Sequence, residues 1–88
     1  MIKVRHLSGD QYEVEVNQST STKHRVTLRA ADKQQLAGEN VAAEQIIEES
    51  FRFLLEREPN TSILRNFDLP VISRYFPDYE REIAKRLQ

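Results

Sequence analysis

The chain has 88 residues, of which 13 are Lys or Arg and 14 are Asp or Glu, so its formal net charge at pH 7 is -1. This length favours a single domain over residues 1–88 with one modest core and a radius of gyration of about 12 Å. The absence of cysteine excludes disulfides, thiolate nucleophiles and cysteine-ligated metals. The near-neutral charge argues against a general nucleic-acid-binding protein.

The N-terminal residues alternate between charged and apolar side chains, without the continuous apolar stretch of a signal peptide. No segment approaches the ~20 apolar residues that a membrane-spanning helix needs. We therefore expect a cytoplasmic protein that does not contact a membrane.

Residues 1–30 are predicted to form strands, because apolar and polar residues alternate with a period of two. The positions on the apolar face are Ile2, Val4 and His6, then Tyr12, Val14 and Val16, then His24, Val26, Leu28 and Ala30. Turn-forming residues at 8–10 and 17–22 separate the three segments. This pattern predicts a three-stranded antiparallel β-meander.

The polar faces of these strands support the same order. The middle strand carries Glu13 and Glu15. The strands on either side carry the cations Lys3, Arg5, Arg25 and Arg29. Opposite charges on neighbouring strands contribute about 0.2–1 kcal/mol per pair, so the charge pattern favours this pairing.

Residues 31–58 are predicted to be helical, with a short turn over 32–36 that Gly38 ends and one long helix over 41–58. Asn40 is the expected N-cap and Pro59 the expected stop. The apolar positions of the long helix are Ala43, Ile46, Ile47, Phe51, Phe53, Leu54 and Leu55. Such a broad stripe predicts a helix that covers the sheet and is buried on more than one side.

Residues 59–88 are predicted to form short helices, because Pro70 and Pro77 suit the first position of a helix. Asp78 and Glu80 near the start of the last helix, and Lys85 and Arg86 at its end, complement the helix dipole. The predicted fold class is α+β: an N-terminal three-stranded antiparallel β-meander covered by one long helix, followed by short C-terminal helices.

No arrangement of residues predicts an enzyme, a cofactor or a metal site. His6 and His24 are too few for a zinc site, and we expect both to be half-buried at the sheet edge. The neighbouring carboxylates Glu13 and Glu15, or Glu56 and Glu58, are read as solvated. The two glycines of the chain form no phosphate loop or dinucleotide motif.

The residues predicted to bind a partner are Arg65, Phe67, Arg74 and Tyr75, because aromatic side chains and arginine are enriched at the centres of interfaces. The partner is predicted to be another protein or a second copy of the chain. An exposed strand edge at residues 1–7 is a second contact surface. The competing interpretation is that the aromatic rings only fill the C-terminal part of the core.

Nucleic acid is the alternative partner, by one of two routes. Residues 62–75 faintly resemble a helix-turn-helix pair with Arg74 on the second helix. The other route is the basic strand face, which the two glutamates of the middle strand interrupt. A small-molecule pocket between the sheet and the C-terminal helices also stays open.

The second half of the chain resembles a group of small bacterial proteins of unknown function. The resemblance lies in residues 53–77, in the stretches Phe53-Leu54-Leu55-Glu56-Arg57-Glu58-Pro59, Ser62-Ile63-Leu64, Phe67-Asp68-Leu69, Ile72 and Arg74-Tyr75-Phe76-Pro77. It implies a bacterial source and a compact helical C-terminal half, and no activity.

Overall fold

Three long strands and one short strand form a four-stranded sheet in the computed structural model, which describes residues 1–38 and 40–87. The strands are β1 (Ile2–Ser8), β2 (Gln11–Asn17), β3 (Ser21–Thr27) and β4 (Asn66–Asp68), in that order across the sheet. The first three pair antiparallel, which confirms the predicted meander. The fourth strand, β4, was not predicted; it pairs parallel with β3 and makes β3 an inner strand.

The register places each glutamate of β2 between two cations. Lys3 and Lys23 flank Glu15, and Arg5 and Arg25 flank Glu13. Arg5 donates a hydrogen bond to the Glu13 carboxylate at 3.0 Å, so the predicted charge pairing is present. The prediction that Arg29 lies on a strand beside these glutamates is wrong, because Arg29 lies beyond the end of β3. Its guanidinium pairs with Asp68 at 3.1 Å.

The helical part of the chain has more elements than the sequence predicted. The helices are α1 (Ala30–Ala37), α2 (Ala43–Leu55), α3 (Ile72–Tyr75) and α4 (Tyr79–Arg86), with 3-10 turns η1 (Asn60–Ser62) and η2 (Leu69–Val71). The expected single turn is therefore a helix of eight residues, and Gly38 at its end has a φ of 77°, which favours glycine. Ala42 rather than Asn40 is the N-cap of α2, and the helix ends before it reaches Pro59.

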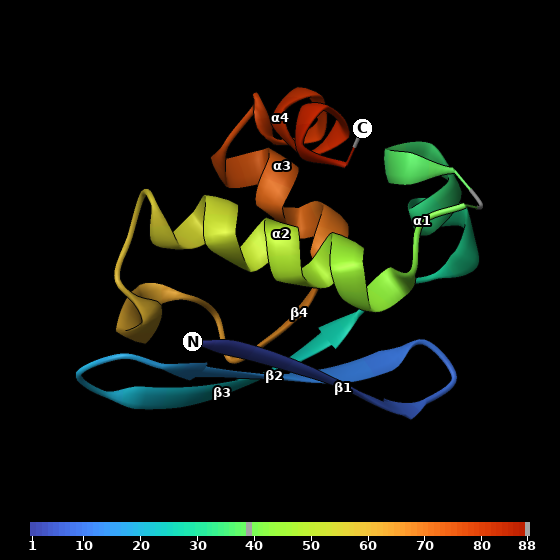
Figure 1. Ribbon diagram of the computed structural model, residues 1–88. Coiled ribbons are helices and arrows are strands. Elements are labelled where there is room, and N and C mark those ends of the chain that lie inside the picture. The colour runs from blue at the N-terminus through green and yellow to red at the C-terminus, as the bar shows by residue number, and fades with distance from the viewer. Residues whose placement is uncertain (39, 88) are drawn as a thin grey trace.

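Helix α2 lies between two layers, with the sheet on one side and α3 and α4 on the other (Figure 1). Its fully or almost fully buried apolar residues are Ile46, Ile47, Phe51, Phe53 and Leu54. This arrangement confirms that the helix is buried on more than one side. The radius of gyration of 11.9 Å agrees with the value expected from the length.

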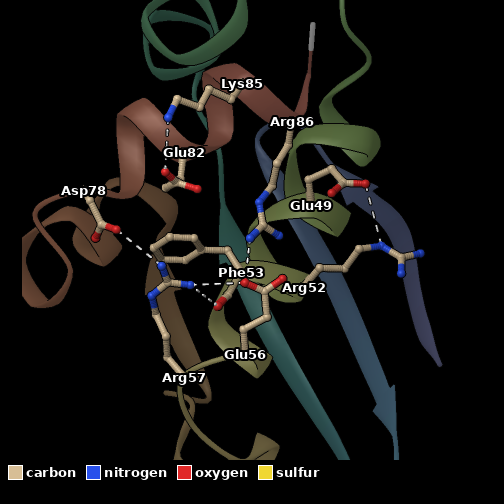
Figure 2. Close-up of polar contacts among 9 residues, drawn as sticks. All are labelled: Glu49, Arg52, Phe53, Glu56, Arg57, Asp78, Glu82, Lys85 and Arg86. Carbon is tan, nitrogen blue, oxygen red and sulfur yellow. Dashed lines mark hydrogen bonds and ion pairs between the residues drawn. The ribbon is translucent and has the colours of Figure 1, made fainter.

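Charged side chains around Phe53 join the end of α2 to α4 (Figure 2). The Arg57 guanidinium lies 3.6 Å from the centre of the Phe53 ring and donates to Asp78 at 3.3 Å. Arg86 donates to the Glu56 carboxylate at 2.6 Å, and this hydrogen bond holds the pKa of Glu56 below its usual range. The cluster therefore uses its cations to hold α4 in place.

Candidate functional site

An apolar groove opens between the end of α2, the segment that follows it, and α3. Its volume is about 180 Å³. It is lined by Leu54, Glu58, Ser62, Ile63, Leu64, Phe67, Val71, Ile72, Tyr75 and Phe76. Pockets for drug-sized ligands run from about 300 to 1,000 Å³, whereas about 150 Å³ holds one benzene ring. The groove therefore suits one or two side chains rather than a whole small molecule.

The floor of the groove is buried and its rim is exposed. Leu54, Phe67 and Ile72 are among the buried core residues. Leu64 is 48% exposed and Tyr75 is 66% exposed, and they are two of the four large apolar side chains that the described residues expose. Exposed apolar side chains that lie together, as these two do at the rim of one groove, are typical of a surface that binds a partner.

A buried network of hydrogen bonds holds the wall of the groove against β3. The Leu64 carbonyl accepts from Nδ1 of His24 at 2.7 Å, so Nε2 of the neutral ring accepts from the Thr22 hydroxyl at 2.9 Å. The Asn60 amide donates to the Thr20 carbonyl at 2.6 Å and to the Thr22 hydroxyl at 3.2 Å. Within the described residues, no buried side-chain nitrogen or oxygen lacks a hydrogen-bond partner, and this network fixes the position of Leu64 on the rim.

The surroundings of the two histidines differ from the expected half-buried edge sites. His24 is only 1% exposed, because Phe51 of α2 and the segment that precedes β4 pack against its ring, and this burial lowers the pKa of the ring. His6 is exposed, and its Nε2 lies 2.8 Å from the Gly9 carbonyl oxygen. Within residues 1–38 and 40–87, no group of three or more His, Asp or Glu side chains is placed to hold a metal ion.

Glu58 is the acidic residue among those that line the groove. Partial burial raises the pKa of its carboxyl. In the part of the chain that the structure describes, Glu58 makes no ion pair, whereas its neighbours Glu56 and Arg57 pair with Arg86 and Asp78. Glu56 does not line the groove, so the two carboxylates do not share one site. Among the described residues, the groove therefore has one carboxyl group in its lining that lacks an ion-pair partner.

The structure brings together two of the four predicted partner-binding residues. Tyr75 stands at the rim of the groove, and Phe67 lies in its floor, 8% exposed, with its ring centre 6.1 Å from that of Phe51. Arg65 and Arg74 are exposed and do not line the groove. Leu64 and Glu58 were not predicted as site residues. The signal for Leu64 was an apolar pair at 63–64 directly after a polar turn, whereas no local pattern marks Glu58.

The helix pair suggested for residues 62–75 is not present. Ile63 has an extended backbone and β4 occupies residues 66–68, so only η2 and α3 follow in helical form. The pairing of β4 with β3 explains this, since its backbone groups bond to a neighbouring strand. The other proposed nucleic-acid surface, the basic strand face, has Glu13 between Arg5 and Arg25.

No helix among the described residues combines the length and the apolar character that crossing a membrane requires. A scan against models of known protein families finds no match to the chain, and searches of curated proteins and of solved structures also find none. The resemblance of residues 53–77 to small bacterial proteins therefore stays an expectation.

Proposed function

We propose that this protein acts by binding another protein rather than by catalysis, and that the apolar groove receives a side chain of that partner. The observation that carries the proposal is the open groove with Leu64 and Tyr75 exposed on its rim. Burying apolar surface is the main favourable contribution to protein association. Phe67 then contributes from the floor of the groove, and Arg65 and Arg74 extend the contact around it.

The partner segment is expected to carry an apolar side chain followed by Lys or Arg. The apolar side chain matches the size of the groove, and the cation matches the unpaired Glu58 carboxylate. A standard interface buries about 800 Å² on each partner, which is more than so small a groove offers. We therefore expect weak, reversible binding of a short segment.

Selection from a random peptide library displayed on phage tests this proposal. The selected peptides should place an apolar residue next to Lys or Arg. Binding should be lost in the double variant Leu64→Ser, Tyr75→Ser, whose side chains are exposed, so the fold is retained. The matched control is Leu7→Ser, which removes an exposed apolar side chain from β1 and should leave binding unchanged.

The role of Glu58 is tested by the variant Glu58→Gln, which keeps the shape of the side chain and removes its charge. Peptides with the cation should bind several-fold more weakly to this variant, and peptides without it equally well. If the selected peptides bind the Leu64→Ser, Tyr75→Ser protein as tightly as the parent, the groove is not the binding site.

Nucleic-acid binding is the competing function, and two observations argue against it. Glu13 and Glu15 stand between the cations of the strand face, and Arg29 is paired with Asp68. Proteins that bind nucleic acid use unpaired cations to neutralise phosphates. A gel-shift assay at low salt with short DNA and RNA should show no retardation, and retardation that Arg5→Glu abolishes would favour this function instead.

A further inference from the structure

The outer edge of β1 carries backbone groups that no other strand uses. β1 is the end strand of the sheet, and no backbone hydrogen bond among the described residues reaches its outer side. Met1 and Asn17 exchange two backbone bonds of 2.8 Å, so they form a hydrogen-bonded pair of the antiparallel ladder. Bonded and non-bonded pairs alternate in such a ladder. The N–H and C=O groups of Ile2, Val4 and His6 therefore point to the open edge.

The two faces of this edge differ in chemistry. Ile2 and Val4 are half-buried and pack against the core, on the face that α2 covers. Lys3 and Arg5 are exposed on the opposite face of the sheet, beside the two glutamates of β2. On this face the sign of the charge therefore alternates from strand to strand, and the edge strand β1 carries the cations. An added strand would continue this alternation if it placed acidic residues beside Lys3 and Arg5.

We propose that the outer edge of β1 binds, by strand addition, an extended segment of a partner protein in which apolar and acidic residues alternate. The backbone of the segment bonds to Ile2, Val4 and His6, and its apolar side chains extend the core beneath α2. Opposite Lys3 and Arg5, the pairs of an antiparallel segment are non-bonded pairs, whose side chains lie closest together. The acidic residues therefore meet the cations at the shortest cross-strand distance.

A second copy of the chain fits this edge poorly. In a two-fold antiparallel pairing centred on Val4, Lys3 of each copy lies opposite Arg5 of the other. Centring the pairing on Lys3 or on Arg5 places two identical cations opposite each other. Like charges in directly opposed positions destabilise a strand pair. The cations of β1 thus act against self-pairing and in favour of an acidic partner.

The edge is regular along the segment that the proposal uses. The irregularity in the pairing of β1 with β2 lies between His6 and Ser8, beyond the last outward-pointing residue. A bulge is one of the features by which edge strands avoid pairing, and here it leaves residues 2–6 available. This edge is separate from the groove, whose lining residues come from other elements.

The test uses two synthetic peptides, Val-Glu-Val-Glu-Val and Val-Lys-Val-Lys-Val, capped at both ends. The acidic peptide should bind the intact protein about tenfold more tightly, since two positions change from attraction to repulsion. In amide hydrogen exchange, the N–H groups of Ile2, Val4 and His6 should gain protection only with the acidic peptide. The N–H groups of Lys3 and Arg5, which bond to β2, should be protected throughout.

Two variants of one residue separate the backbone contact from the side chain. Val4→Pro removes an outward N–H that β2 does not use, so the strand is retained and peptide binding should be lost. Val4→Ala also removes the valine side chain beyond Cβ, but it keeps the backbone N–H. This variant should therefore still bind the acidic peptide. The proposal is overturned if both peptides bind equally, if neither protects the outward amides, or if the free protein forms dimers through this edge as its concentration rises.

Discussion

Phe51 packs between the sheet and the segment that follows α2. It is fully buried, and its ring lies 5.3 Å from His24 and 6.1 Å from Phe67. Phe51→Ala should lower the free energy of unfolding by about 3–4 kcal/mol, because it leaves a cavity among strands and helix. Urea denaturation measures this change. Gln45→Ala, an exposed change on the same helix, should stay within about 0.5 kcal/mol of the parent; overlapping curves for Phe51→Ala and the parent would contradict this placement.

His24 should make stability depend on pH. Burial lowers the pKa of its ring in the folded protein, whereas in the unfolded chain the pKa is about 6.5. Below that pH the unfolded state binds the extra proton, so the free energy of unfolding falls as pH drops through about 6.5 toward the folded pKa. Urea denaturation between pH 7.5 and about 5.5 measures the fall. The variant His24→Gln should lose it, and parallel pH profiles for the two proteins would refute the assignment.

At the scale of elements, a buried hydroxyl pair joins α2 to α4. The Ser50 hydroxyl donates to the Ile46 carbonyl at 2.7 Å, so the Tyr79 hydroxyl, 2.6 Å away, donates to Ser50. Tyr79 is fully buried, and this burial raises the pKa of its phenol. The pair therefore fixes how α4 lies on α2.

Tyr79→Phe removes this hydrogen bond and keeps the ring. It should lower the free energy of unfolding by about 1 kcal/mol, since Ser50 keeps its own acceptor. Thermal unfolding followed by circular dichroism measures the change. The control is Tyr75→Phe, because the Tyr75 side chain is 66% exposed and its hydroxyl is solvated. Equal effects of the two substitutions would show that the buried pair contributes nothing specific.

For the whole molecule, α2 needs both layers that surround it. A fragment of residues 1–58 retains the meander and α2 but loses β4, α3 and α4. Phe53, which packs on Phe76 and Tyr79, would then be exposed on the outer side of α2. We expect this fragment to lack a cooperative thermal transition, which circular dichroism would detect. A fragment that melts like the full chain would mean that residues 59–88 are not part of one cooperative unit.

Local periodicity was enough to predict the three strands of the meander and the long helix α2. Alternation of Tyr12, Val14 and Val16 with charged residues defines β2, because side chains in a strand point alternately to two faces. The broad stripe of α2 follows in the same way from helical periodicity. These signals lie within a few residues of one another, so they can be read without knowing what packs against them.

The candidate site could be predicted only in part, because its residues meet through tertiary contacts. Phe67 and Tyr75 were predicted because they belong to a cluster of aromatic residues near prolines, and both line the groove. Nothing local to Leu64 indicates that its carbonyl accepts a bond from His24, forty residues away in sequence.

The strands of the meander, the covering helix and the alternation of charge across the sheet could therefore be predicted from the residues alone. Three further features follow only from packing: residues 66–68 form a strand, His24 is fully buried, and Glu58 lines a groove. Each of these features depends on contacts between residues that are distant in the chain, and β4 is the clearest example. A three-residue strand has too few residues to show a period, and it forms because β3 offers it backbone partners.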